Sequence, residues 1–429
     1  MTASDKCNHN CAECKKEEKN ICSSCKHYIE NMIQHMDISP SMADILKSPQ
    51  RVITFKVPLR HDSGEVKHYN GYRVQYNDAL GPTKGGIRFH PEVDIEDVKT
   101  LSFLMSLKCS LVGLPFGGGK GGIEVDPKQL SEAELERLSR SYVRQIHNFI
   151  GPDLDIPAPD VNTNAQVMAW MVDEYSKIKG KFIPGVFTGK PLEMGGSKGR
   201  SISTSLGGAY ILRKLVEMEK LEPSKLKVAV QGFGNVGSNV AKILYDWGYK
   251  VVAISNSKEA IYNPEGLDIP DILKQQSGSR NFPKVPKSKS ITNNELLKLD
   301  FDILIPSALS SQVTPSVAEE LKAKIILELA NAPVTPNADS ILFKKGVKVI
   351  PDILANAGGV IVSYFEWVQN SSNEYWTEEV VFEKLEKIMV ESFEKVCKTC
   401  KSEHCTLRDA AYIVAIDRIL KAEKLRGNL

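Results

Sequence analysis

The sequence predicts an α/β protein with an N-terminal α/β domain built on a mixed sheet, followed by a Rossmann-like, doubly wound domain. Three observations predict this. At 429 residues the chain is too long for one ordinary hydrophobic core. Short apolar runs alternate with helical segments between 200 and 360, which is typical of a parallel sheet covered on both faces. A glycine-rich turn follows the first of these runs.

The expected boundaries place a Cys-rich extension first, then the mixed-sheet domain, then the doubly wound domain, with C-terminal helices completing the mixed-sheet domain: 1–30, 31–200, 201–370 and 371–429. In the mixed-sheet domain, Tyr72–Tyr76 alternates like a strand and Asp94–Leu111 carries the apolar period of a helix. The segments 81–91 and 113–123 are rich in glycine and are expected to form loops.

In the doubly wound domain, each expected strand is a short apolar run bounded by polar or glycine residues. These runs are 227–233, 249–255, 301–307, 324–330 and 347–352. Helices are expected to close the chain at 374–396 and 407–424.

Charge and composition exclude several classes of function. Lys+Arg 55 against Asp+Glu 53 gives a net charge of +2, so neither nucleic acid nor an anionic membrane surface is expected as a partner. No apolar run reaches the length of a membrane span. Residues 1–30 lack the features of a targeting peptide, so a cytoplasmic protein is expected.

The glycine-rich turn has the spacing of a dinucleotide fingerprint. Gly232, Gly234 and Gly237 follow a strand and open a helix, which is the context that the fingerprint requires. The phosphates are then expected at the helix N-terminus, close to Asn235 and Val236. We expect a nicotinamide dinucleotide at this turn.

The end of the second strand bears on which dinucleotide binds. NAD enzymes usually carry an acidic residue there for the ribose hydroxyls. Here the strand ends in Ser255 and Asn256, followed by Lys258, with no carboxylate to repel a 2′-phosphate. NADP is therefore somewhat favoured, and NAD remains open.

Two lysines lie in the glycine-rich segments. Lys84 and Lys120 are each followed by Gly-Gly, which suits close approach of a small ligand, although flexible turns with solvated lysines are the alternative. A lysine crowded by other cations and partly desolvated has a lowered pKa and can act as a base. Asp160 lies in a Pro-held loop, where it either moves protons or caps the helix that follows.

Six segments in this order resemble glutamate dehydrogenase, within the superfamily that includes leucine, valine and phenylalanine dehydrogenases. The resemblance runs from about Val52 to Arg426. The segments are YRVQYNDALGPTKGGIRFHPEVD, LPFGGGKGGI, DIPAPDVNT, PGVFTGKP, QGFGNVG and IPDILANAGGVIVSYFEWVQN.

The resemblance implies a role for each matching residue. Lys84 and Ser363 would bind the side-chain carboxylate of the substrate, and Lys108 its α-carboxylate. Lys120 would be the catalytic lysine, with Asp160 as its proton partner. Four positions match residues near the cofactor or its nicotinamide end: Thr204, Asn235, Asn331 and Asn356.

The implied reaction interconverts L-glutamate with 2-oxoglutarate and ammonium, using NADP or NAD, and family members imply a homohexamer. Two alternatives are a dehydrogenase for leucine, valine or phenylalanine, and a sensor that binds nucleotide and metabolite without turnover. Lys84 and Ser363 argue against the first alternative, because a buried cation facing an apolar side chain would be unpaired. Lys120 and Asp160 argue against the second.

The chain departs from the family pattern near the cofactor. Ser205, Leu329 and Ala332 stand where the family usually has glycine, and Asn256 replaces a frequent aspartate.

The extension contains two CxxC pairs, Cys11 with Cys14 and Cys22 with Cys25. These are ligands for a structural zinc ion, although the seven-residue gap between the pairs is shorter than in zinc ribbons. A disordered tail with reduced thiols is an equal alternative, and a redox switch is a third. Because the catalytic motifs lie downstream, deletion of residues 1–30 is expected to leave catalysis standing.

Overall fold

The computed structural model describes residue 28, residues 30–276 and residues 281–429. The chain forms two compact units. The mixed-sheet unit contains residues 33–211, 357–405 and 409–429. The doubly wound unit contains residues 212–356 and 406–408, together with the described residues up to Met32.

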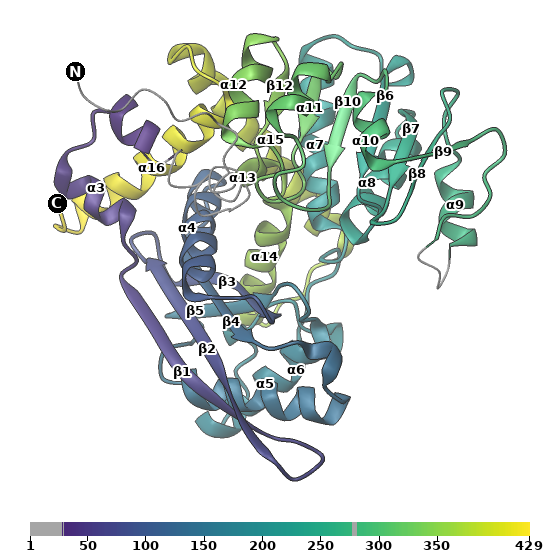
Figure 1. Ribbon diagram of the computed structural model, residues 1–429. Helices are drawn as coiled ribbons and strands as arrows, with labels where there is room; N and C mark the ends of the chain where they lie inside the picture. The colour runs from purple at the N-terminus through teal and green to yellow at the C-terminus, as the bar shows by residue number, and fades with distance from the viewer. Residues whose placement is uncertain (1–27, 29, 277–280) are drawn as a thin grey trace, which may run out of the picture. The chain divides into compact units, whose positions relative to one another are not determined.

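The mixed-sheet unit is built on a five-stranded sheet in the order β1-β2-β4-β3-β5. Its strands are β1 (Arg51–Arg60), β2 (Val66–Asn77), β3 (Thr83–His90), β4 (Gly117–Glu124) and β5 (Asp155–Pro159). β1 and β2 form a long antiparallel hairpin (Figure 1), and β2 continues antiparallel to β4. β3 is parallel to both β4 and β5.

The expectation that the two glycine-rich segments form loops is wrong, because they are the central strands β3 and β4. A Cβ on Gly85 would overlap the carbonyl oxygen of Gly119 in the neighbouring strand. A Cβ on Gly118 would overlap Ser106 in helix α4 (Ile95–Leu111). The missing side chains therefore let strands and helix approach more closely than other residues allow.

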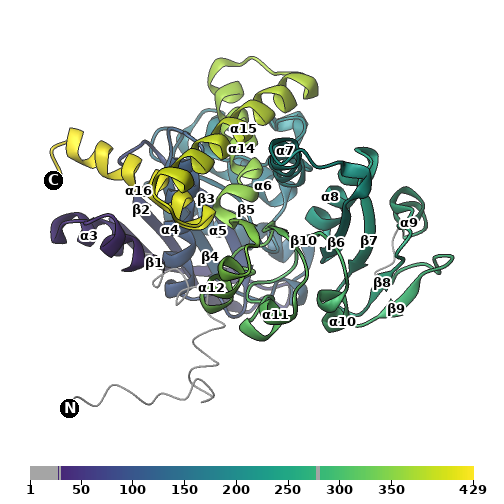
Figure 2. The same ribbon diagram turned by 90° about the horizontal axis from the view of Figure 1, so that it is seen from above.

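Helices cover both faces of this sheet. Because side chains alternate along a strand, Ile87 and Ile123 point to one face, where they join the core formed with α5 (Glu132–Ile146) and α6 (Ala165–Lys179). Lys84 and Lys120 point to the opposite face, on which Gly118 admits α4. Later in the chain, α14 (Gly358–Ser372) and α15 (Glu378–Ser402) pack together (Figure 2).

The doubly wound unit contains a seven-stranded sheet in the order β12-β11-β10-β6-β7-β8-β9. The strands are β6 (Lys227–Gln231), β7 (Lys250–Ser255), β8 (Ala260–Tyr262), β9 (Lys289–Ile291), β10 (Ile303–Pro306), β11 (Ile325–Leu327) and β12 (Lys348–Ile350). All five expected strands are present and mutually parallel. The antiparallel β8 and β9 were not expected, since each has only three residues and no apolar run of its own.

Helices connect these strands and cover the sheet. They are α8 (Asn235–Asp246), α9 (Ile269–Gln275), α10 (Asn293–Lys298), α11 (Pro315–Glu320), α12 (Pro336–Lys344) and α13 (Asp352–Ala355). The helices α7 (Ser203–Met218) and α16 (Leu407–Leu425) contain residues of both units. In the described part of the chain, no helix combines the length and the apolar character needed to cross a membrane.

Candidate active site

Lys120 and Asp160 form a close ion pair in the mixed-sheet unit. The Lys120 ammonium lies 2.8 Å from one carboxylate oxygen of Asp160, which directly follows β5. The other oxygen accepts a hydrogen bond of 2.8 Å from Nε of Arg88 in β3. The backbone N–H of Asp160 donates to the Thr163 hydroxyl at 2.8 Å, which holds the loop in place. Two cations therefore fix one carboxylate.

The surroundings shift both pKa values of this pair. Burial lowers the pKa of Lys120 to about 8, against the opposing charge of Asp160, and the cations Arg88 and Lys108 lower it further. Burial alone would raise the pKa of Asp160, but Lys120 and Arg88 more than offset it and hold this pKa well below its usual value. Near neutral pH, Lys120 is thus close to its titration point, where a group can both take and give a proton.

Lys84 is a buried lysine whose ammonium group lacks a partner within residues 30–276 and 281–429. Its side chain is in β3 and the residue is only 1% exposed. Among the residues that the structure describes, none forms a hydrogen bond or ion pair with its ammonium group. Burial lowers the pKa of Lys84 to about 7, and the charges of Arg200 and Arg73 act in the same direction. An unpaired buried ammonium is costly unless an anion binds it.

Ser363 lies beside another cation. Its hydroxyl, on α14, donates to the carbonyl oxygen of Gly359 at 2.9 Å and accepts from Nε of Arg200 at 3.2 Å. Burial lowers the pKa of the Arg200 guanidinium, and the charge of Arg200 in turn lowers the pKa of Lys84. Lys84, Arg200 and Ser363 therefore share one electrostatic environment.

The remaining residues expected to bind substrate lie in the same unit. Lys108 is in the last turn of α4, close enough to Lys120 for its charge to lower the Lys120 pKa. Thr204, expected near the cofactor, lies in α7 beside α14, where a Cβ added to Gly359 would be 2.8 Å from its hydroxyl.

Sequence reasoning did not single out Arg88 or Arg200. Arg88 lies four residues after Lys84 on a strand, so the period of two places both side chains on one face. That period was not used because β3 was expected to be a loop. Arg200 follows a glycine-rich turn, and no feature of the sequence ties it to Ser363, 163 residues away.

In the doubly wound unit, the three fingerprint glycines occupy three different environments. Gly232 has a φ of 95°, and a Cβ there would lie 2.6 Å from the Cβ of Ala308. A Cβ on Gly237 would overlap the Gly232 carbonyl, whereas one on Gly234 would meet nothing within 4 Å. Gly234 also caps α8 without a side-chain hydrogen bond. Open space at uncapped N–H groups fits a pyrophosphate.

A cavity of about 810 Å³ opens at this turn. Its lining includes four of the expected cofactor residues: Gly232, Gly234, Ser255 and Asn256. None of the described lining residues is charged. Lys258 lines a different, smaller cavity, and its ammonium donates to Asn281 at 3.4 Å. The side-chain oxygen of Asn256 accepts from the backbone N–H groups of Lys258 and Glu259.

The other expected cofactor residues of this unit are not among the residues that line this cavity. Asn235 and Val236 begin α8. Asn331 and Asn356 follow β11 and β12, and the Asn356 amide donates to the Asn331 side-chain oxygen at 3.0 Å. The structure thus gathers the expected residues into two groups, one in each unit.

The expected zinc ligands Cys11, Cys14, Cys22 and Cys25 lie outside the described residues. Within residues 30–276 and 281–429, the structure contains no group of three or more His, Cys, Asp or Glu side chains suited to a metal ion. Among the described residues, Cys109, Cys397, Cys400 and Cys405 form no disulfide.

Two family models match most of the chain. A model of the Glu/Leu/Phe/Val dehydrogenase dimerisation domain matches residues 49–177. A model described as glutamate/leucine/phenylalanine/valine dehydrogenase matches residues 195–427. The two matches together include every predicted catalytic, substrate-binding and cofactor-binding residue.

Similar proteins and structures extend over nearly the same length. A catabolic NAD-specific glutamate dehydrogenase of Bacillus subtilis (strain 168) is 47% identical over 414 residues, 96% of this chain and 97% of that protein. An NAD-specific glutamate dehydrogenase of Staphylococcus aureus (strain COL) is 47% identical, covering 96% and 99%. A hetero-hexameric glutamate dehydrogenase from Thermus thermophilus, in its Leu-bound form, is similar with a TM-score of 0.90 and 36% identity, covering 95% and 97%. The glutamate dehydrogenase of Peptoniphilus asaccharolyticus has a TM-score of 0.85 and 41% identity, covering 96% and 100%.

Proposed function

The chain belongs to the glutamate/leucine/phenylalanine/valine dehydrogenase family, and we propose that it interconverts L-glutamate with 2-oxoglutarate and ammonia by hydride transfer to NAD(P)+. Glutamate is proposed as the substrate mainly because the buried ammonium of Lys84 has no hydrogen-bond or ion-pair partner in the described part of the chain. A pocket for leucine, valine or phenylalanine would leave this cation without a counter-ion, whereas the side-chain carboxylate of glutamate supplies one.

Each substrate carboxylate has a cation assigned to it in this proposal. Lys84 and Ser363 hold the side-chain carboxylate, and Arg200 orients the Ser363 hydroxyl through its 3.2 Å hydrogen bond. Lys108 holds the α-carboxylate from the last turn of α4. Because Lys108 also lies close to Lys120, the Cα of the substrate would be placed near the catalytic lysine.

Lys120 and Asp160 move the protons in this mechanism. With a pKa of about 8, neutral Lys120 takes a proton from the substrate ammonium and then from the water that hydrolyses the imine. Asp160 holds Lys120 in position and takes each proton from its ammonium for release to solvent, while Arg88 orients the carboxylate through its 2.8 Å hydrogen bond. The nicotinamide coenzyme, when bound, accepts the hydride from Cα.

The direct test is a kinetic panel. NADH or NADPH formation is measured with glutamate, leucine, valine and phenylalanine, each with NAD and NADP. Glutamate is expected to give the highest kcat/KM by a wide margin. A higher kcat/KM for any of the three apolar amino acids contradicts the proposed substrate.

For the coenzyme we propose NAD. The Bacillus subtilis and Staphylococcus aureus relatives are both named as NAD-specific enzymes, and they do not support the expected preference for NADP. The described lining of the 810 Å³ cavity also offers no cation to a 2′-phosphate, because Lys258 lines another cavity. The kcat/KM with NAD should therefore exceed that with NADP by at least about tenfold, or ~1.4 kcal/mol. An equal or higher value with NADP contradicts this choice.

We further propose a homohexamer. One similar structure is that of a hetero-hexamer, and this chain exposes apolar side chains that a partner subunit would cover: Phe149, Leu154, Ile178 and Phe182. Light scattering on the purified protein measures the assembly directly, and a monomeric mass contradicts it.

Zinc binding by the four cysteines of the extension is a separate hypothesis that rests on their spacing. Metal analysis of the purified protein tests it, with deletion of residues 1–27 as the control. Zinc content near zero in the intact chain would contradict it and leave the reduced thiols and the redox switch as interpretations.

A further inference from the structure

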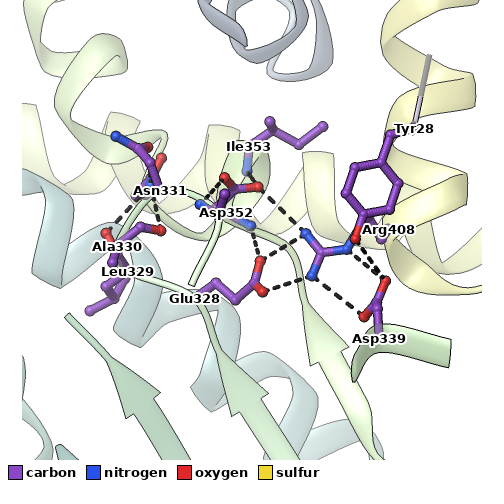
Figure 3. Close-up of polar contacts among 11 residues, drawn as sticks. Tyr28, Glu328, Leu329, Ala330, Asn331, Asp339, Asp352, Ile353 and Arg408 are labelled. Atoms are coloured by element: carbon purple, nitrogen blue, oxygen red, sulfur yellow. Dashed lines mark hydrogen bonds and ion pairs between the residues drawn. The ribbon is translucent and has the colours of Figure 1, made fainter. Parts of the chain in front are cut away.

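Arg408 is a buried arginine surrounded by carboxylates in the doubly wound unit (Figure 3). Its two terminal nitrogens donate to both oxygens of Glu328, at 2.9 and 2.7 Å. Its Nε donates to Asp339 at 2.8 Å, and Asp352 lies 3.6 Å away. Arg408 is 2% exposed and Glu328 is fully buried. Removing this many charges from water is costly in free energy unless close, well-oriented ion pairs and hydrogen bonds offset the lost hydration.

The cluster forms hydrogen bonds that hold a strained backbone turn in place. The backbone N–H of Asp352 donates to Glu328 at 2.8 Å, and the Asp352 side chain accepts from the N–H of Ala332 at 2.8 Å. Ala332 has a φ of 44°, in the left-handed region that alanine adopts only at a cost. It stands where the family usually has glycine. Asp352 therefore holds a backbone conformation that the residue itself disfavours.

Two asparagines depend on this turn. Asn331 immediately precedes Ala332, is exposed, and accepts from the Asn356 side chain at 3.0 Å. Asn356 in turn donates its backbone N–H to the carbonyl of Asp352 at 3.1 Å. The side-chain oxygen of Asn356 is buried and has no partner among the described residues. It is an acceptor available to a donor on a ligand.

The sheet topology places these asparagines beside the coenzyme site. β6, which leads into the glycine turn, pairs with β10, and β10 pairs with β11, all parallel. Their carboxyl ends share one edge of the sheet, where a dinucleotide binds. Ser255 and Asn256 mark the opposite side of the glycine turn, at the end of β7. A dinucleotide with its phosphates on α8 and its adenosine at β7 therefore directs its other half towards β10 and β11.

We propose that Arg408 is a positioning residue for the dehydrogenase reaction: through Glu328 and Asp352 it holds Asn331 and Asn356 where the nicotinamide half of the coenzyme binds. This inference rests on the proposed function, since it assigns the coenzyme to the glycine turn. Arg408 itself touches neither coenzyme nor substrate in this arrangement.

Tyr28 closes the cluster from the N-terminal side. Its ring centroid lies 5.3 Å from the Arg408 guanidinium carbon, its hydroxyl donates to Asp339 at 3.5 Å, and it is 8% exposed. Tyr28 therefore contacts both members of the Arg408–Asp339 pair. Deletion of residues 1–27 keeps Tyr28, whereas deletion of residues 1–30 removes it. Only the longer deletion should therefore weaken NADH binding, while Lys120 and Asp160 stay in place in both deletions.

The test compares Arg408→Met with Leu342→Ala. Leu342 is a buried apolar residue of α12, so its truncation destabilises the same unit while removing none of the hydrogen bonds or ion pairs of the cluster. Melting temperature, NADH affinity by fluorescence, kcat and both KM values are measured. Arg408→Met should weaken NADH binding or lower kcat by roughly tenfold to a hundredfold, with little change in glutamate KM. Leu342→Ala should lower the melting temperature and leave these constants unchanged.

Two further variants separate positioning from stability. Arg408→Lys should lose less coenzyme affinity than Arg408→Met but should not reach the unaltered value, because an ammonium cannot form the paired hydrogen bonds to both Glu328 oxygens. Adding Ala332→Gly to Arg408→Met should restore coenzyme affinity, since glycine adopts the turn without the Asp352 bond. If Arg408→Met yields no folded protein, the same addition is made to Arg408→Lys.

The inference is overturned if Arg408→Met and Leu342→Ala, at similar losses of melting temperature, show the same kinetic constants, or if Ala332→Gly restores nothing. Failure of the proposed function would be visible separately. In that case the unaltered protein would form no NADH or NADPH with glutamate.

Discussion

Lys120 and Asp160 are joined at 2.8 Å, and Arg88 holds the same carboxylate from its other oxygen at 2.8 Å. The arrangement keeps Asp160 ionised while burial keeps the Lys120 pKa near 8. A lysine that loses its proton readily beside a carboxylate that holds none is suited to repeated proton transfer.

Lys120→Ala should abolish turnover while NADH binding stays within about twofold, because Lys120 acts on the substrate and not on the coenzyme phosphates. Asp160→Asn should lower kcat by about 10²- to 10⁴-fold through lost proton transfer. Stopped-flow and fluorescence titrations measure the two effects separately. Lys99→Ala, which changes a half-buried lysine on α4, is the matched control and should behave as the unaltered enzyme. Near-normal turnover in Lys120→Ala would contradict the proposed catalytic role of Lys120.

The pH dependence follows from two lysines with opposite requirements. Lys120 must be neutral, so kcat/KM for glutamate rises with pH as this group, of pKa about 8, loses its proton. Lys84 must be charged, so kcat/KM falls as this group, of pKa about 7, loses its proton. The product of the two fractions is a bell with its maximum between pH 7 and 8. In Lys84→Met the alkaline fall should disappear, leaving a single rise. If kcat/KM still falls at alkaline pH in this variant, the fall is caused by another titrating group and the assignment to Lys84 is wrong.

The buried ion pair between Lys190 and Glu366 is the basis for a prediction about the free energy of unfolding. Both side chains are fully buried, and the Lys190 ammonium lies 2.6 Å from Glu366, which also accepts from the backbone N–H of Gly189. Lys190→Met should cost about 3–5 kcal/mol of unfolding free energy, since it leaves a buried carboxylate without its cation. Denaturant unfolding measures the loss. Lys190→Met with Glu366→Gln should recover part of it, and a double variant no more stable than the single one contradicts the explanation.

Much of the site could be predicted because many of its functional residues lie in short, continuous sequence motifs. The glycine fingerprint and the lysines at 84 and 120 each lie in a short motif, and the parallel strands follow from apolar runs of the right length. Arg200 could not be found this way, because its link to Ser363 spans 163 residues and exists only in the folded chain. The Arg408 cluster could not be predicted from the sequence for the same reason, since Arg408 and its three carboxylate partners come from four separate segments.

The glycine-rich strands show why local reasoning failed elsewhere. Glycine is a poor strand former on its own, so 81–91 and 113–123 were expected to be loops. In the fold, the lack of a side chain at Gly85 and Gly118 is what permits the close packing of β3, β4 and α4. Tertiary packing overrides the local propensity there. Loop-like composition concealed that Lys84 and Arg88 share a face.

The unpaired ammonium of Lys84 is the basis for glutamate as the substrate, and one measurement tests it most directly. The ratio of kcat/KM for glutamate to that for leucine is determined in the unaltered enzyme and in Lys84→Leu. Removal of the charge should lower kcat/KM for glutamate about 100-fold, the value of a charged hydrogen bond, and should raise the relative use of leucine. An unchanged ratio would show that the side-chain carboxylate is bound elsewhere.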